Sequence, residues 1–259
     1  METVFKNISC RESHQIAHLT LGRGELNILS LEMLQEMNQV LADWREDASL
    51  RAVVITHEGR CFSAGLDVKE YQENSEKAVE MIATYHELFR SLEQLPCPTV
   101  SCVRGPALGG GCELALFTDF LLAGESAQFG QPETRLGCFP PVAVSFLPRR
   151  MGWHRAMEFI LLGQPISARQ AQEWGLATQV FPDERFAALS HQYLQNFSAS
   201  SAQALRLAKQ AMKRGGQEQT LYAMEKAREL YLKELITSEE AAEGISAFLE
   251  KRQPRWAAR

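Results

Sequence analysis

Short, uninterrupted runs of apolar residues alternate in the first half of this chain with segments of helical periodicity. The runs at 51–56, 99–103 and 120–124 are rich in β-branched or bulky aliphatic residues, as buried strands are. Between them, apolar residues recur every three or four positions at 31–41 and 79–92, which predicts amphipathic helices. Strands that are apolar at nearly every position are buried on both faces. We therefore predict an α/β fold with a mainly parallel sheet covered by helices.

The last third of the chain has little strand signal. Helical patterns are predicted at 200–214, 220–235 and 239–251, and capping-box patterns begin at Ser167 and Thr237. These helices cannot bury all their apolar faces by themselves. We expect them to pack on a neighbouring part of the chain or on a partner subunit.

Composition excludes several classes of protein. The chain carries 27 Lys and Arg against 32 Asp and Glu, a net charge of −5, which argues against nucleic-acid binding. The sequence contains no run of about 18 apolar residues, so we expect no membrane span. The start of the sequence lacks the apolar core of a secretory signal. The six cysteines lack the spacing of zinc sites, so we expect reduced, mostly buried thiols and no metal. Together these features predict a cytoplasmic protein.

Residues 103–137 hold the densest set of candidate functional residues. The glycines at 109–111 stand where a loop meets a predicted helix, so backbone N–H groups could approach a ligand closely. The phosphate-binding patterns GxxxxGK[ST] and GxGxxG are absent. These N–H groups could instead bind a carbonyl oxygen that gains negative charge during a reaction. A turn needed only for tight packing is the alternative.

Two glutamates lie within this region, both after the glycine run. Glu113 stands in an otherwise apolar helical segment, and Glu133 follows twenty residues later in a loop after a strand. If both entered one apolar pocket, one would titrate at high pH, which suits general acid–base chemistry. The alternatives are an exposed glutamate at a helix start and a solvated turn residue, and spacing alone does not decide between them.

A further element lies upstream, at residues 61–71. Gly65 could present the backbone N–H of Leu66, and Lys69 stands near a predicted helix start. For Lys69 taken alone, a solvated surface position is the simpler interpretation.

Four motifs together, FSAGLDVKE, RGPALGGGCELAL, AQFGQPETRLG and EGISAFLEKR, resemble the enoyl-CoA hydratase/isomerase (crotonase) superfamily from about residue 16 to 252. The resemblance implies a β/α spiral core, which we assign to residues 1–195. It also implies a helical C-terminal trimerisation region, assigned to 196–259, and a homo-oligomer, either a trimer or a hexamer made of two trimers.

The resemblance also implies site residues. The oxyanion hole falls on the backbone N–H groups of Leu66 and Gly110, and the two hydratase glutamates fall on Glu113 and Glu133. The coenzyme A contacts that it implies fall on Ala64, Lys69 and Lys251. The implied partner is an acyl-CoA substrate that carries coenzyme A itself, so no separate cofactor is expected.

One segment departs from the common short-chain pattern. After Gly137, residues 138–148 place Pro140, Pro141 and Val142 where flexible glycines are usual, so we expect a reshaped pocket next to Glu133. This segment and the C-terminal motifs most resemble the cyclic dienoyl-CoA hydratases of anaerobic benzoyl-CoA degradation. The implied reaction is hydration of cyclohexa-1,5-diene-1-carbonyl-CoA to 6-hydroxycyclohex-1-ene-1-carbonyl-CoA.

Other functions remain as alternatives. A general short-chain 2-enoyl-CoA hydratase comes next, followed by an isomerase, a decarboxylase or a polyketide-pathway relative. From another class, a non-catalytic acyl-CoA-binding or RNA-binding relative is disfavoured by the acidic charge balance and by the presence of both glutamates. A metal enzyme and a serine hydrolase lack their motifs.

Overall fold

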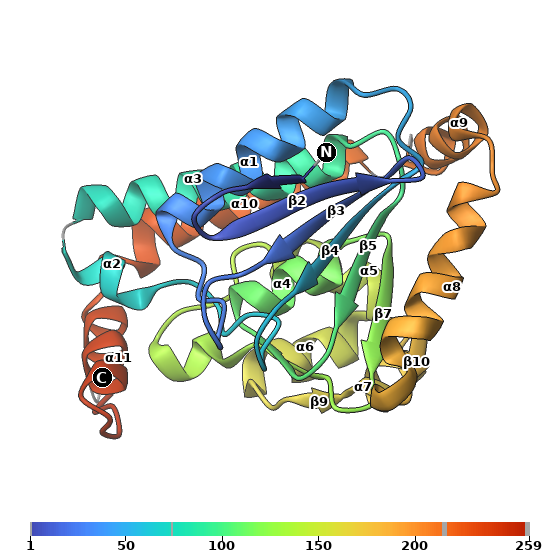
Figure 1. Cartoon of the computed structure of the whole chain (residues 1–259). Helices are drawn as coiled ribbons and strands as arrows, with labels where there is room; N and C mark the ends of the chain where they lie inside the picture. Colours follow the sequence, from blue (N-terminus) through green and yellow to red (C-terminus); the bar gives the residue numbers. More distant parts are fainter. Residues whose placement is uncertain (1, 74, 214–216, 257–259) are drawn as a thin grey trace.

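The computed structural model describes residues 2–73, 75–213 and 217–256 and contains a seven-stranded sheet and a three-stranded sheet (Figure 1). The large sheet has the order β1-β2-β3-β4-β5-β7-β10. Pairs from β3 to β10 are parallel, and β1-β2-β3 is antiparallel. The strands are β1 (Glu2–Val4), β2 (Ile8–Ser13), β3 (Ile16–Leu21), β4 (Ala52–His57), β5 (Thr99–Val103), β6 (Pro106–Leu108), β7 (Phe120–Gly124), β8 (Gln128–Gly130), β9 (Ile166–Ser167) and β10 (Gln179–Phe181).

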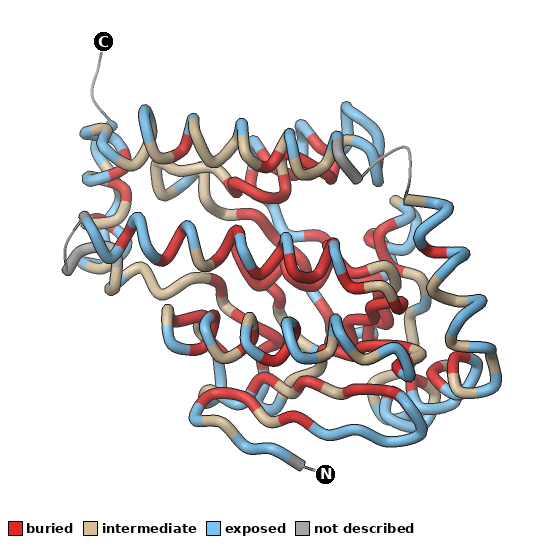
Figure 2. Tube along the Cα trace, turned by 90° about the horizontal axis from the view of Figure 1, so that it is seen from above, coloured by how far each residue is buried: buried red, intermediate tan, exposed pale blue. Residues whose placement is uncertain are grey.

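Helices connect the parallel strands and form most of the last third of the described chain. They are α1 (Leu31–Glu46), α2 (Val68–Glu73), α3 (Ser75–Gln94), α4 (Gly110–Phe117), α5 (Ala143–Met151), α6 (Trp153–Leu162), α7 (Ala168–Glu173), α8 (Phe186–Ser198), α9 (Ala202–Lys213), α10 (Gln217–Leu230) and α11 (Glu239–Leu249). Short 3₁₀ turns span Pro132–Leu136 (η1) and Asp183–Arg185 (η2), and a π-helical segment spans Tyr231–Leu235 (η3). Figure 2 shows buried and exposed positions alternating along these helices, as amphipathic packing requires.

Both faces of the large sheet are covered, as the continuous apolar strands predict. Within β4, Val53 and Ile55 belong to the main core, whereas Ala52 and Val54 join a second cluster on the opposite face. Helix α8 contributes to that second cluster and runs beside β7 and β10 in Figure 1. The alternation of side chains along a strand explains why each strand needs apolar residues at successive positions.

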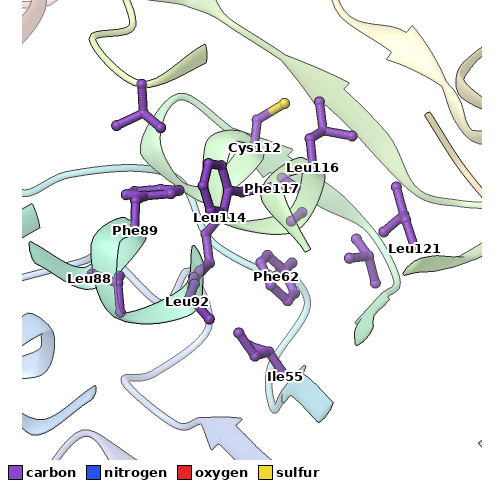
Figure 3. Close-up of a cluster of buried hydrophobic side chains, with 14 of the residues drawn as sticks. Ile55, Phe62, Leu88, Phe89, Leu92, Cys112, Leu114, Leu116, Phe117 and Leu121 are labelled. Carbon is purple, nitrogen blue, oxygen red and sulfur yellow. The ribbon is translucent and has the colours of Figure 1, made fainter. Parts of the chain in front are cut away.

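The main core connects α3 to α4, the helix that carries Glu113. Phe89 of α3 packs edge-to-face on Phe117 of α4 at 5.0 Å between ring centroids, and Leu92 and Leu114 lie in the same buried cluster (Figure 3). Such aromatic pairs stabilise beyond their buried area by about 0.5–1.5 kcal/mol. In α3 the predicted apolar positions Ile82, Phe89 and Leu92 are buried, but Val79 is 48% exposed.

Two parts of the sheet architecture differ from the expectation. The β1-β2 hairpin extends the sheet by antiparallel strands, and β6, β8 and β9 form a separate small sheet. The strands of the small sheet are only two or three residues long, too short for a periodic pattern. The small sheet matters for function because β6 ends at Leu108, directly before the three glycines.

The C-terminal helices fold onto their own chain. Helix α10 contacts α3 and α5, and α11 contacts η1. The contact with η1 is close: a Cβ added at Gly244 would lie 2.2 Å from the carbonyl oxygen of Leu136. The predicted cap at Ser167 is present, but α11 is capped by Ser238, whose Oγ accepts from the N–H of Ala241 at 3.1 Å. The prediction of Thr237 as this cap is wrong by one residue, because Ser238 has the extended backbone of an N-cap.

The predicted free and mostly buried thiols are confirmed: all six cysteines are unpaired with one another, and five are buried. In the described part of the chain, no helix combines the length and the apolar character that crossing a membrane requires.

Candidate active site

The N-terminus of α4 is one wall of the site. Gly109 has a φ of +53°, which favours glycine, and turns the chain from β6 into the helix. Its N–H donates to the carbonyl oxygen of Gly130 at 2.9 Å. The next N–H, that of Gly110, makes no hydrogen bond to any group in the part of the chain that the structure describes. A helix start leaves such N–H groups available to a ligand.

The segment at Gly65 and Leu66 forms the facing wall. Gly65 has a φ of +102°, and a Cβ added there would lie 3.1 Å from the carbonyl oxygen of Leu108 and 3.4 Å from the nitrogen of Gly110. Only glycine therefore lets the two segments approach this closely. Leu66 is held by backbone bonds on either side, from Leu29 to Gly65 and from Asp67 to Leu29. Among the described residues its own N–H has no acceptor.

Glu113 is buried in the first turn of α4, with 1% of its surface exposed. Its Oε1 accepts from the N–H of Val142 at 2.8 Å and from that of Ala143 at 2.6 Å. Its Oε2 accepts from the hydroxyl of Tyr85 at 2.6 Å. Burial raises the pKa of Glu113 to about 7, and the three donors act against a larger rise because they favour the charged form. The alternative of an exposed helix-start glutamate is excluded.

Glu133 is half-buried in η1, after β8. The side-chain amide of Gln131, oriented with its NH₂ group toward the carboxyl, donates to both oxygens of Glu133 at 3.1 Å. Burial first, and then the charge of Glu113, raise the pKa of Glu133 well above its ordinary value. Its backbone N–H acts in the opposite direction.

The structure brings the two predicted glutamates to one place. The Oε1 of Glu133 lies 3.0 Å from where a Cβ on Gly109 would be, and Glu113 lies one helical turn further along α4. Burial first, and then the charges of Glu133 and Glu113, raise the pKa of the Cys112 thiol of α4. Two carboxyls therefore adjoin two N–H groups, those of Leu66 and Gly110, that have no acceptor among the residues that the structure describes.

The other predicted site residues lie outside this inner group. Ala64 is half-buried, and its N–H donates to the carbonyl oxygen of Leu26 at 2.9 Å. Lys69 is exposed at the start of α2, and Lys251 is exposed just after α11, with a φ of +54°. Both lysines carry charge at the surface.

Sequence reasoning missed three features of the site: Tyr85, Gln131 and the N–H groups of Val142 and Ala143. A tyrosine on the inner face of α3 is one available signal, because a buried phenol needs a hydrogen-bond partner. The predicted reshaping by Pro140, Pro141 and Val142 concerned the surroundings of Glu133. In the structure this segment bonds to Glu113, through the N–H of Val142.

In the part of the chain that the structure describes, no three His, Cys, Asp or Glu side chains gather as metal ligands would. The described residues of the site offer two carboxyls with raised pKa values and two N–H groups of the kind that can stabilise an oxyanion.

Comparison with known proteins assigns the chain to a family. The model of the family described as enoyl-CoA hydratase/isomerase matches residues 11–259. The chain belongs to this enoyl-CoA hydratase/isomerase family. The predicted superfamily is thereby confirmed.

Relatives in this family cover nearly the whole chain. A 2,3-dehydroadipyl-CoA hydratase of Escherichia coli is 38% identical over 239 residues, which is 91% of this chain and 92% of that protein. A cyclohexa-1,5-dienecarbonyl-CoA hydratase of Thauera aromatica is 34% identical over 241 residues, 93% of this chain and 92% of that protein. The crystal structure of an enoyl-CoA hydratase from Mycobacterium avium subsp. paratuberculosis has a TM-score of 0.88 at 27% identity. The match spans 97% of this chain and 99% of the chain in that crystal structure.

These matches confirm two predictions for this enoyl-CoA hydratase/isomerase family member. The α/β architecture is that of its solved relatives. The predicted class of enzyme, a hydro-lyase that acts on an enoyl-CoA thioester, is supported by the family and by the names of the relatives.

Proposed function

We propose that this enzyme adds water to a carbon–carbon double bond conjugated with the thioester carbonyl of an acyl-CoA. One observation carries the proposal: a buried carboxyl and a half-buried one adjoin two backbone N–H groups that have no acceptor within the described chain. The N–H groups of Leu66 and Gly110 would bind the thioester oxygen as it becomes an enolate. Each such donor contributes roughly 2.7–4 kcal/mol in the transition state, so the two donors together would exceed the contribution of either carboxyl taken alone.

The two glutamates divide the proton transfers. Three donors favour the ionised form of Glu113, whereas Glu133 has the Gln131 amide and its own N–H and is opposed by the charge of Glu113. Near neutral pH the proton of the pair therefore belongs on Glu133. Glu113 is the general base for water, and Glu133 is the general acid for carbon.

The step balances in atoms and electrons. A water oxygen bonds to the β-carbon while Glu113 takes the water proton, and the electron pair of the double bond moves to the thioester oxygen. The enolate then collapses as Glu133 gives its proton to the terminal carbon of the conjugated system. Proton exchange with solvent returns both carboxyls to their starting forms. General acid–base assistance of this kind is worth about 10²–10⁴-fold per group.

For the substrate we propose cyclohexa-1,5-diene-1-carbonyl-CoA, with 6-hydroxycyclohex-1-ene-1-carbonyl-CoA as product. The rigid Pro140-Pro141-Val142 segment supports a shaped pocket rather than a flexible one. The Thauera aromatica relative, named for this activity, supports it as well. A linear 2-enoyl-CoA is the second candidate, favoured by the 38% identity to the Escherichia coli 2,3-dehydroadipyl-CoA hydratase.

Coenzyme A binding, assembly and location complete the proposal. Lys69 and Lys251 would contact the phosphates of coenzyme A and offset the net charge of −5, and Ala64 would line the coenzyme site. We further propose a trimer, or a hexamer of two trimers, in the cytoplasm.

The test compares initial rates on crotonyl-CoA and on cyclohexa-1,5-diene-1-carbonyl-CoA. The hydrated products are separated and quantified by chromatography, because the cyclic product keeps one double bond conjugated with the thioester. We expect kcat/KM to favour the cyclic substrate. A preference for crotonyl-CoA would move the assignment to the general hydratase. Binding of either thioester without formation of a hydrated product would make the protein a non-catalytic binder and refute hydration.

A further inference from the structure

Tyr85 is a buried polar residue that the proposed reaction does not yet use. It lies on the inner face of α3 with 0% of its surface exposed. Its hydroxyl lies 2.6 Å from Oε2 of Glu113 and 3.1 Å from the carbonyl oxygen of Gly110. One phenol therefore contacts both the base and the glycine that begins the same helix.

The phenol oxygen is held rigidly by its surroundings. The ring of Tyr85 packs edge-to-face on Phe89 at 4.8 Å between centroids, and Phe89 packs in the same way on Phe117 of α4. A Cβ added at Gly110 would lie 3.0 Å from the hydroxyl, so space around it is tight. A rigid aromatic donor loses little conformational entropy when it binds a carboxylate, which suits it to orienting one.

The two contacts match the two protonation states of Glu113. The phenol has one proton and can also accept. When Glu113 is ionised, the proton points to its Oε2. Once Glu113 has taken a proton from water, the phenol can accept from the new O–H and turn its own proton to the carbonyl oxygen of Gly110.

We propose that Tyr85 is a positioning residue that fixes the carboxylate of Glu113 in one orientation and favours its ionised form during hydration. The proposal rests on the function proposed above. The charge-assisted bond to the ionised carboxylate is stronger than the neutral bonds that replace it after protonation, so removal of the hydroxyl disfavours the base form.

Several groups face Glu113 from the elements packed against it. Tyr85 comes from α3, Glu133 from η1, Cys112 from α4 itself, and α5 with the residue before it offers the N–H groups at 142 and 143. Tyr85 and the N–H groups favour the carboxylate, whereas a charge on Glu133 opposes it. The phenol is the one side-chain donor in this set, and it can be removed without changing the backbone.

The test is the pH profile of kcat/KM for Tyr85→Phe, with Tyr193→Phe as a matched control. Tyr193 lies in α8, in the cluster on the other face of the sheet. We expect Tyr85→Phe to move the acid limb upward by roughly one to two pH units, so that the deficit is largest at low pH and shrinks as pH rises. KM should change little, and Tyr193→Phe should follow the unmodified enzyme. An acid limb at its original pH would overturn the proposal, even if the rate fell uniformly.

A second measurement does not depend on activity. Infrared titration of ¹³C-glutamate-labelled protein, with the Glu113 band assigned by its loss in Glu113→Gln, reports the carboxyl directly. An upward shift in Tyr85→Phe supports the proposal even if no substrate is hydrated, and an unchanged titration overturns it. If Tyr85→Phe fails to fold, 3-fluorotyrosine at position 85 decides: its more acidic phenol should lower the titration midpoint of Glu113, and no change would refute the role.

Discussion

Glu113 and Glu133 are the same residue type in two different surroundings. Glu113 is fully enclosed between α3, α4 and α5 and accepts three hydrogen bonds, two from backbone N–H groups and one from Tyr85. Glu133 is half-buried on a short 3₁₀ turn, beside a single side-chain amide. Burial raises the pKa of both carboxyls. Glu113 is the less exposed of the two, yet more hydrogen-bond donors stabilise its ionised form.

The difference shows that burial alone does not assign a role to a carboxyl. Desolvation opposes the charge at both positions, and the donors around each group decide which one keeps it. Because the two charges also repel, the pair titrates in two steps that belong to both groups together. The environments thereby separate a base from an acid.

The largest expected effect comes from removing either carboxyl. Glu113→Gln and Glu133→Gln should each reduce turnover by about 10²–10⁴-fold, because an amide neither takes nor gives the proton. Folding should persist, since the amide oxygen at 113 still accepts from the two N–H groups. Steady-state kinetics with Glu87→Gln, an exposed position of α3, as control checks this. Near-normal turnover in both single variants would contradict the assignment.

Adjacent glycines allow the two carboxyls to be disturbed separately. A Cβ at Gly109 would lie 3.0 Å from Oε1 of Glu133, whereas one at Gly110 would lie 3.0 Å from the hydroxyl of Tyr85. We expect both alanine variants to lose roughly 10- to 100-fold in kcat/KM, because small displacements at a site are costly. Gly109→Ala should alter the alkaline limb of the pH profile and Gly110→Ala the acid limb.

The control for backbone strain is Gly152→Ala, since Gly152 has a φ of +84° with no atom within 4 Å of the added Cβ. An equal loss in Gly109→Ala and Gly152→Ala would mean that backbone strain at a positive φ, and not contact with Glu133, causes the effect of Gly109→Ala.

The pH dependence of the unmodified enzyme distinguishes the roles. The base must be ionised, so kcat/KM should fall as pH drops through the pKa of Glu113, at about 7. The acid must be protonated, so the rate should also fall when Glu133 ionises at higher pH. The residual activity of Glu133→Gln should still show the fall in kcat/KM at low pH, because Glu113 is present. The residual activity of Glu113→Gln should no longer show this fall. The reverse pattern would exchange the two roles.

The smallest expected effect concerns stability. The folded-state pKa of Glu133 is raised, so ionisation of this carboxyl costs stability as pH rises above its unfolded value toward its folded value. Glu133→Gln removes this cost and should stabilise the fold by about 1 kcal/mol at alkaline pH, a few degrees in Tm. Thermal unfolding at pH 6 and pH 9 measures it. If the stability difference between Glu133→Gln and the unmodified protein shrinks as pH rises, ionisation of Glu133 does not destabilise the fold.

Much of the fold could be predicted because it depends on local pattern. The predicted strands at 99–103 and 120–124 match β5 and β7, and the helix predicted to begin at Leu31 begins there. The hairpin of β1 and β2 was missed because its alternation is weak, and the strands of the small sheet were missed because they are too short to show any period. The cap of α11 was misplaced because Thr237 and Ser238 are both good caps, and backbone geometry chose between them.

The site divides in the same way. The residue types could be read directly: a glycine run before a helix, two carboxyls twenty residues apart, and motifs shared with a known family. The enclosure of Glu113, the donors to it from Tyr85 of α3 and from the backbone of residues 142–143, and the support of Glu133 by Gln131 emerge only in the folded chain. A carboxyl's charge state depends on burial and on nearby donors, and these come from segments far apart in the chain that meet only when the core packs.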